Sequence, residues 1–261
     1  IALSSEDNRN FRDVRKLADG EGIKKSNAVT IPGKKIIRDF LARYSDKGLK
    51  IILPDDYLEI DPSFDGILTT YRNKGALYIF KRSLFNEIDL SATKSPILVA
   101  ELPEISEWSG EIVDGCNPVI PFQDPLNVGS AVRSAAGFGV KRIILTRDAA
   151  NPYHPKSIRS SAGAVFEVEF VRGPRLEDFQ VIMEPSEEKI FTLDKSGSPL
   201  NTISFPEKFI VIPGIEGPGL PENLKIDTVS IPLSDNIESL NAAVALSIFL
   251  YQWRIKKNLT Y

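Results

Sequence analysis

The chain has 261 residues, 42% of them hydrophobic and 26% charged, which is ordinary for a globular protein of one large domain or two smaller ones. No apolar run reaches the ~18 residues that a membrane helix needs, and the single cysteine excludes an internal disulfide. One histidine and one cysteine exclude a metal site built from those ligands, so we expect no metal. The missing membrane segment and the single cysteine lead us to expect a cytoplasmic protein. The net charge of −3 argues mildly against a nucleic-acid partner unless the basic residues form a patch.

Basic residues gather near the start of the chain. Arg9, Arg12, Lys34 and Lys35 belong to the most basic runs there. A run of charge is usually a solvated face, but these four are our candidates for contact with RNA.

The first part of the chain alternates helical and strand-like patterns. Residues 31–44 carry apolar residues at helical spacing, with Pro32 placed as an early helix residue. Short β-type runs follow at 50–53, 66–69, 77–80 and 97–100. We therefore predict a small α/β domain over residues 1–104, with a boundary near 102–112 where Pro103 and Gly110 interrupt the pattern.

From residue 105 onward, strands alternate with helices. Strands are predicted at 118–122, 142–146, 165–170, 189–193, 209–213 and 227–231, and helices at 128–137, 176–183 and 239–257. Apolar strands alternating with helices indicate a mostly parallel sheet covered on both faces. Ligands of such sheets bind at the carboxyl ends of the strands, so the loops there are the place to seek a site.

Three segments that follow predicted strands carry the candidate chemistry. In residues 123–134, Asn127 is placed to cap a helix that carries Arg133. In residues 211–220, Gly214, Gly217 and Gly219 make a loop that can approach a ligand closely, with Glu216 as its ionisable group. In residues 231–245, Ser239 or Asn236 is placed to cap the last helix, and Asn241 is a polar group in its first turn. Taken singly, each segment is also explained by a capped helix or a tight turn.

Together, and in this order, the segments resemble the SpoU (TrmH-like) family of RNA ribose methyltransferases. The family motif N-x-G-x-x-x-R matches Asn127, Gly129 and Arg133, and the motif G-x-E-G-x-G matches Gly214, Glu216, Gly217 and Gly219. The final I-P and S-L-N motifs match Ile231-Pro232 and Ser239-Leu240-Asn241. A lesser match is residues 161–164, and the resemblance covers about residues 117–261.

The resemblance implies a fold, a cofactor and a partner. It implies a trefoil knot in the α/β domain of residues 105–261, a homodimer formed near the first-motif helix and the last helix, and a ribosomal-protein-like RNA-binding domain before it. It also implies S-adenosyl-L-methionine as methyl donor and a 2′-hydroxyl of ribosomal or, less favoured, transfer RNA as acceptor. The cofactor-binding residues that it implies are Leu193, Ile212, Gly214, Glu216, Gly217, Ile231, Leu233, Leu240 and Asn241.

The catalytic residues implied by the resemblance are Asn127, Arg133, Glu216, Ser239 and Asn241. The family's arginine is often drawn as a general base, but a guanidinium keeps its proton at neutral pH. Our hypothesis is that Arg133 stabilises the developing alkoxide and holds the adjacent phosphate. Glu216 would orient Arg133, and Asn127 would hold the ribose or the arginine.

The sequence departs from the family pattern at Ile215, at Asp235-Asn236 and at Ala242-Ala243, where one hydroxyl is lost. These departures and the mild acidity keep a second hypothesis open, which is a non-catalytic RNA-binding or ribosome assembly protein of the same fold. A nucleotide-dependent oxidoreductase or a hydrolase is less favoured, because the dinucleotide fingerprint, the nucleophile elbow and the phosphate-binding loop motif are all missing from the sequence. His154, the single histidine, is predicted to have a structural role.

Overall fold

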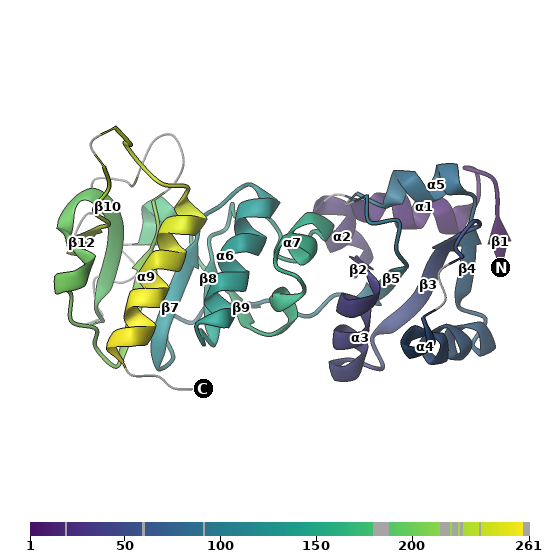
Figure 1. Ribbon diagram of the computed structural model, residues 1–261, viewed down its shortest axis with the longest axis horizontal. Helices are drawn as coiled ribbons and strands as arrows, with labels where there is room; N and C mark the ends of the chain where they lie inside the picture. The colour runs from purple at the N-terminus through teal and green to yellow at the C-terminus, as the bar shows by residue number, and fades with distance from the viewer. Residues whose placement is uncertain are drawn as a thin grey trace. The chain divides into compact units, whose positions relative to one another are not determined.

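A computed structural model describes residues 1–18, 20–58, 61–90, 92–179, 188–214, 220, 224, 227–234 and 236–257 of the chain. The chain forms two compact units. Unit 1 contains residues 1–104 together with 151–163, and unit 2 contains residues 105–150 and 164–261 (Figure 1). The inclusion of residues 151–163 in unit 1 is not indicated by the sequence pattern.

Unit 1 is a five-stranded mixed sheet with helices on both faces. The sheet order is β1-β4-β3-β5-β2, in which β1, β4 and β3 run parallel and β5 pairs antiparallel with both β3 and β2. Its strands are β1 (Ala2–Leu3), β2 (Ala28–Pro32), β3 (Gly48–Pro54), β4 (Leu77–Phe80) and β5 (Ile97–Glu101). Its helices are α1 (Arg9–Arg15), α2 (Gly20–Ser26), α3 (Lys34–Arg43), α4 (Pro62–Asn73), α5 (Arg82–Ile88) and α7 (Pro155–Ser160), and a 3₁₀ turn covers Lys16–Ala18.

The core of unit 1 explains which helix covers which face. Phe11 of α1 and Phe85 of α5 are fully buried in a cluster with Ile52 and Phe80 of the sheet. In Figure 1, α1 and α5 lie along one side of the sheet, and α3 and α4 lie along the other. The segment that returns from residue 151 is also part of this unit, because α7 packs against β2 and buries Ile158 completely.

Two predictions in unit 1 are wrong. Residues 66–69, predicted as a strand, belong to α4, because Asp61 caps that helix and Pro62 occupies its first turn. The predicted helix over 31–44 begins only at Lys34. Pro32 is the last residue of β2, an edge strand where a missing N–H is tolerated.

Unit 2 contains a seven-stranded sheet in the order β12-β10-β11-β7-β8-β9-β6, and every pairing in it is parallel. This confirms the predicted mostly parallel α/β sheet. Its strands are β6 (Ser106–Glu107), β7 (Gly115–Ile120), β8 (Arg142–Leu145), β9 (Glu169–Arg172), β10 (Ile190–Pro199), β11 (Lys208–Ile212) and β12 (Asp227–Ser230). Its helices are α6 (Pro125–Gly137) and α9 (Ala242–Lys256), with 3₁₀ turns at Ala164–Phe166, Leu176–Asp178 and Leu200–Thr202.

Both faces of this sheet are covered by apolar side chains. On one face, Phe249 and Trp253 of α9 pack against Phe209 of β11, with ring centroids 6.1 and 6.0 Å apart. The other cluster joins Ile144 and Ile210 of the sheet to Phe179, whose ring stacks on Trp108 at 5.3 Å. Burial on both faces is what parallel strands require.

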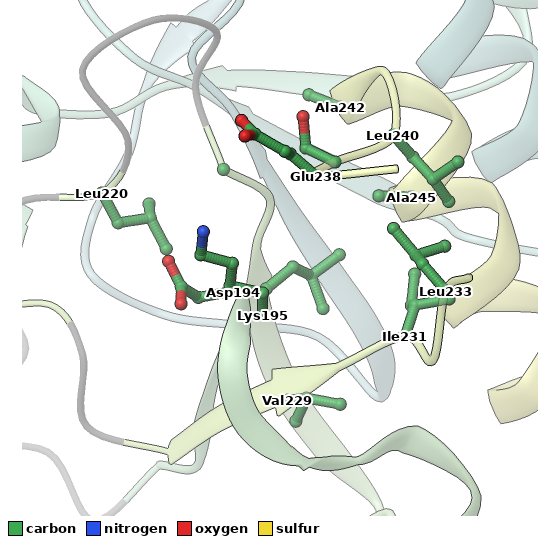
Figure 2. A pocket seen from close by; sticks show the side chains of 13 residues that line it. Asp194, Lys195, Leu220, Val229, Ile231, Leu233, Glu238, Leu240, Ala242 and Ala245 are labelled. Carbon is green, nitrogen blue, oxygen red and sulfur yellow. The ribbon is translucent and has the colours of Figure 1, made fainter. Parts of the chain in front are cut away.

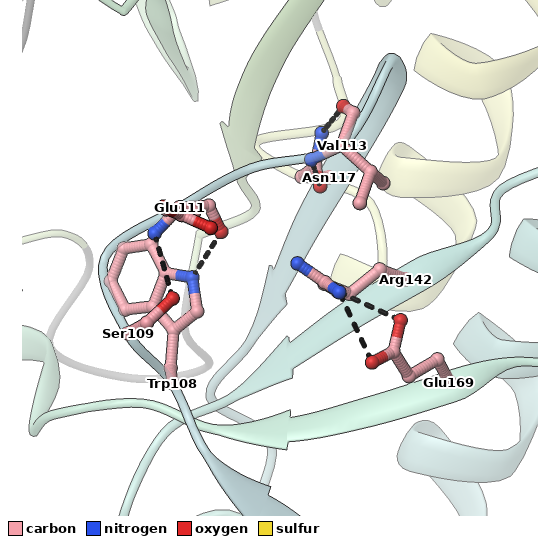
Figure 3. A network of polar contacts seen from close by, with 7 residues as sticks. All are labelled: Trp108, Ser109, Glu111, Val113, Asn117, Arg142 and Glu169. Atoms are coloured by element: carbon pink, nitrogen blue, oxygen red, sulfur yellow. Dashed lines mark hydrogen bonds and ion pairs between the residues drawn. The ribbon is translucent and has the colours of Figure 1, made fainter.

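Polar contacts fix the segment that leads into β7 and connect β8 to β9 (Figure 3). The buried Asn117 side chain accepts from the Val113 N–H at 3.0 Å and donates to the Val113 carbonyl at 2.7 Å. Arg142 of β8 donates two hydrogen bonds to Glu169 of β9, at 2.8 and 3.1 Å. Since each group has its partner, these contacts support the fold rather than a site.

Several predicted boundaries in unit 2 need correction. The predicted strand at 165–170 is a 3₁₀ turn followed by β9. Of the predicted helix 176–183, Leu176–Asp178 form a 3₁₀ turn and Phe179 is helical. Residues 180–183 of that prediction lie outside the described residues. β10 continues to Pro199 with a register shift between Leu193 and Ser198 that the apolar pattern did not indicate.

Candidate functional site

A cavity of about 350 Å³ opens in unit 2 at one end of β10, β11 and β12. Figure 2 shows side chains from β10, from the segment after β12 and from the start of α9 turned toward the same space. Its lining residues are Leu193, Asp194, Lys195, Gly214, Leu220, Val229, Ile231, Leu233, Glu238, Ser239, Leu240, Ala242 and Ala245. The site therefore lies where the parallel sheet predicts a ligand.

Most of the predicted cofactor residues that the structure describes meet at this cavity. They are Leu193, Gly214, Ile231, Leu233 and Leu240, and the predicted catalytic residue Ser239 also lines it. Ile212 does not line it, because its side chain is fully buried in the core on β11. Glu216 and Gly217, like Ile215 and Asp235, lie outside the described residues.

The wall of the cavity combines apolar and charged groups. Leucine and isoleucine side chains supply apolar surface, while Asp194, Lys195 and Glu238 supply charge. Gly214 leaves room near the backbone, since a Cβ there would lie 3.4 Å from the Leu193 carbonyl oxygen. Such a mixture suits a ligand with both apolar and charged parts.

The predicted site residues do not include Asp194, Lys195 and Glu238, although each lies in a loop where the resemblance places the cofactor. The first two follow directly after the predicted strand 189–193, so the rule for carboxyl ends of parallel strands already indicated them. Asp194 also forms a local turn, in which its carboxylate accepts from the Ser196 N–H at 2.9 Å and from the Ser196 hydroxyl at 2.7 Å. Glu238 lies in the loop between the predicted strand 227–231 and the predicted helix 239–257, where a single acidic residue gave no separate signal.

Helix α9 is capped by Asn241, and not by Ser239 or Asn236 as predicted. The Asn241 side-chain oxygen Oδ1 accepts from the N–H groups of Ala243 at 3.0 Å and Val244 at 3.3 Å. Asparagine is among the best residues at this position because its short side chain satisfies unpaired N–H groups. The later helix start leaves residues 238–240 in the loop, where they line the cavity.

Helix α6 also begins earlier than predicted. Asp124 is its cap and accepts from the Leu126 N–H at 2.9 Å, with Pro125 in the first turn. Asn127 is therefore not the cap but a residue of the first turn. Its side-chain oxygen accepts a hydrogen bond from the Asn241 amide at 3.1 Å, so the predicted pair of asparagines does meet.

Arg133 lies on α6 with an exposed side chain. Within the described ranges no hydrogen bond or ion pair of its guanidinium is found. An exposed guanidinium on this helix can bind a phosphate or stabilise a developing negative charge. α6 packs directly on α9, whose first residues line the cavity.

Three of the four predicted RNA-binding residues take part in ion pairs. Lys34 pairs with Asp61 at 3.0 Å, Lys35 with Asp39 at 2.8 Å, and Arg9 with Asp13 at 3.7 Å. Arg12 is exposed. The arginines lie on α1 and the lysines on α3, which Figure 1 shows on opposite sides of the sheet, so one flat surface does not carry all four.

His154 caps α7 through Nδ1, which accepts from the Lys156 N–H at 3.1 Å, and this supports its structural role. The described residues include no group of three or more histidine, cysteine or acidic side chains suited to a metal ion. Over the same residues, every helix is too short or too polar to cross a bilayer.

Comparison with known proteins agrees with the geometry. A model of the SpoU rRNA Methylase family matches residues 119–251. "Ribosomal RNA small subunit methyltransferase G 2" of Syntrophobacter fumaroxidans is 36% identical over 96% of this chain, and this chain spans about half (48%) of that relative. "23S rRNA (guanosine(2553)-2'-O)-methyltransferase RlmP" of Bacillus subtilis is 26% identical over 97% of this chain and 98% of its own length.

Solved structures show the same fold over the whole chain. An AdoMet-bound rRNA methyltransferase from Sinorhizobium meliloti has a TM-score of 0.81 at 20% identity, covering 100% of this chain and 99% of its own. The SpoU methyltransferase AviRb from Streptomyces viridochromogenes, solved with AdoMet, has a TM-score of 0.79 at 22% identity, covering 97% and 100%. Because the family model spans more than half of the sequence, the chain belongs to the SpoU rRNA methylase family.

Proposed function

We propose that this protein transfers a methyl group from S-adenosyl-L-methionine to a ribose 2′-hydroxyl of structured RNA, with ribosomal RNA favoured over transfer RNA. The observation that carries the proposal is the meeting of the motif segments. Residues from three separate strand ends line one cavity, and the asparagines of the first and last motifs share a hydrogen bond beside it. The name of the Bacillus subtilis relative RlmP, a 23S rRNA 2′-O-methyltransferase, supports the same reaction.

The residues of the cavity suit the methyl donor. Leu193, Ile231 and Leu240 offer apolar contact to an adenine ring, and the charged groups suit the hydroxyl, ammonium and carboxylate parts of the molecule. When bound, S-adenosylmethionine supplies a methyl group whose bond to the sulfonium sulfur breaks with the electron pair staying on sulfur. The chain's task is then to position the ribose oxygen and to manage its proton.

Arg133 carries the chemistry in this proposal. Its guanidinium stays protonated and stabilises the negative charge that develops on the 2′-oxygen, while it binds the neighbouring phosphate through its fork of N–H groups. The hydroxyl proton passes to water as the new oxygen–carbon bond forms. Asn127 and Asn241 hold the start of α6, the helix of Arg133, against the start of α9, whose first residues line the cavity.

The finer features of the fold are part of the same proposal. A trefoil knot is supported by the strand order, since β10 lies between β11 and β12 while α9 returns to pack on α6. Unit 1 would bind the RNA, with the exposed Arg12 on α1 as one candidate contact, in the cytoplasm where ribosomal RNA is modified. A homodimer through α6 and α9 is supported by exposed apolar residues on both helices, namely Leu126, Val244, Tyr251 and Ile255, each 48–54% exposed.

The decisive test combines binding and product mapping. Calorimetry should show S-adenosylmethionine binding to the wild-type chain, and 2′-O-methyl mapping of ribosomal RNA should show one added methyl group. Arg133→Ala should lose methyl transfer by at least a hundredfold and keep cofactor binding, and Arg133→Lys should fail as well because lysine lacks the fork. A chain that binds no methyl donor at millimolar concentration would instead support a non-catalytic RNA-binding protein.

A further inference from the structure

Two serines join the helix that carries Arg133 to the helix that lines the cavity. The Ser247 hydroxyl of α9 lies 2.7 Å from the Ser134 hydroxyl of α6 and 2.7 Å from the Ala243 carbonyl. The Ser134 hydroxyl also lies 3.2 Å from the Ser130 carbonyl. Each hydroxyl has one proton, and the 2.7 Å approach of the two oxygens needs a proton between them. Either Ser247 donates to Ser134 and Ser134 donates to the Ser130 carbonyl, or Ser134 donates to Ser247 and Ser247 donates to the Ala243 carbonyl.

This pair is the second polar connection between the same two helices. The first is the bond between Asn127 and Asn241, at the start of both helices. Ser134 lies seven residues beyond Asn127, about 10 Å along α6, and about 20° from it around the helix axis. Ser247 lies six residues beyond Asn241 on α9. The two connections therefore lie on one face of α6, and the helices run in the same direction.

Two connections on one face determine the rotation of a helix, whereas one connection leaves it free to turn. Ala131 and Ala135 of α6 and Ala243 of α9 are fully or almost fully buried, and at the end of α6 the ring of Phe138 meets the ring of Tyr251 of α9 edge-on, with centroids 6.1 Å apart. Alanine methyl groups do not interlock, so they resist rotation weakly. The hydroxyl pair is thus the polar contact that holds the far end of α6 in register with α9.

We propose that Ser134 and Ser247 are positioning residues for methyl transfer, which set the direction in which Arg133 projects from α6. Arg133 lies next to Ser134 and about 100° from it around the axis. If α6 rotated about its axis by about 20°, an atom that lies about 6 Å from the axis would be displaced by about 2 Å. Misplacement by about 1 Å can cost a hundredfold in rate, so loss of the pair should lower kcat without removing any group that touches the reactants. This inference rests on the proposed function.

The matched substitutions are Ser247→Val and Ser247→Thr, which have nearly the same shape and differ in the hydroxyl. Ser247→Val should lower kcat at least tenfold, with the KM for S-adenosylmethionine and its calorimetric Kd within twofold of wild type. Ser247→Thr should keep kcat within about threefold, because threonine retains a hydroxyl that can bond to the helix and to Ser134. Thr202→Val removes a hydroxyl that bonds only to the Pro199 carbonyl, at 2.7 Å, and serves as the control with unchanged kcat.

A second measurement does not depend on activity. A double-mutant cycle of Ser134→Ala and Ser247→Ala, read from unfolding in urea, should show that the two changes are not additive. Equal loss of kcat in the valine and threonine variants, or full kcat in the valine variant of an active enzyme, would overturn the positioning role. So would additive effects in the cycle. A wild-type chain that transfers no methyl group would instead refute the proposed function.

Discussion

Asn241 has two separable tasks, and substitution can measure each. Its side-chain oxygen caps α9, and its amide nitrogen donates to Asn127. Loss of a cap costs about 1 kcal/mol. The bond to Asn127 lies at an exposed end of the helix, so about 0.5 kcal/mol is its expected value. Asn241→Ala should therefore destabilise unit 2 by about 1.5 kcal/mol, and Asn127→Ala by about 0.5 kcal/mol.

Two further variants separate the tasks. Asn241→Ser keeps a cap of similar quality and loses only the bond, so it should match Asn127→Ala at about 0.5 kcal/mol. The double variant Asn127→Ala with Asn241→Ala should be no less stable than Asn241→Ala alone, because the second substitution removes a partner that is already lost. Asn236→Ala is the control, since Asn236 was the rival cap in the sequence and should have no effect.

The assay is urea unfolding followed by tryptophan fluorescence. The chain has two tryptophans, Trp108 and Trp253, and both belong to unit 2, so the signal reports this unit. The midpoint should fall without a change in the slope m. In a thermal experiment, 1.5 kcal/mol corresponds to a decrease of about 3–6 °C in Tm. An Asn241→Ala variant as stable as wild type, or equal losses in the alanine and serine variants, would refute the capping role.

Three other outcomes follow from burial and charge. Cys116 is buried and burial raises the pKa of its thiol, so Ellman's reagent at pH 8 should label it only after unfolding; rapid labelling of the native chain would contradict this. Hydrogen bonding from Ser63 and Lys34 lowers the pKa of Asp61 from 3.8 to about 2, so its charge stabilises unit 1 above about pH 4 and this contribution is lost as the pH falls through 2. In Asp61→Asn the new asparagine side chain can still cap α4, so this variant tests the charge alone. It should be less stable than wild type at pH 6, and the two stabilities should converge near pH 2. A stability difference that stays constant with pH would exclude the charge as the cause. Ile158 is fully buried in unit 1, so Ile158→Ala should lower the free energy of unfolding of this unit by about 2–5 kcal/mol. The same variant should speed hydrogen exchange in β2 but not in β7. Faster exchange in β7 alone would show that residues 151–163 do not belong to unit 1.

The sequence by itself determined the class of fold and the order of the functional segments. Short apolar strands alternating with helices require a parallel sheet buried on both faces, and the all-parallel sheet of unit 2 has this form. The motif residues could be recognised from the sequence because asparagine, glycine and arginine stand at fixed spacings in segments that follow predicted strands. Parallel strands bring their carboxyl ends to one edge, and for this reason Leu193, Gly214 and Ile231 were predicted together and meet at one cavity.

Only the tertiary structure decided which of several competing local signals applies. Asp124 and Asn127 both suit the cap of α6, and Ser239 and Asn241 both suit the cap of α9. Packing of α6 on α9 selects Asp124 and Asn241 as the caps. Asn127 is then left to bond to Asn241 across the two helices. The β-type run at 66–69 became helix because Asp61 and Pro62 start α4 in front of it. Lys34 gained a partner in Asp61 through contacts distant in sequence, and residues 151–163 joined unit 1 in the same way. Local propensity is worth a few tenths of a kcal/mol per residue, while burial of one side chain is worth about 1.5–3 kcal/mol, so packing decides wherever the two disagree.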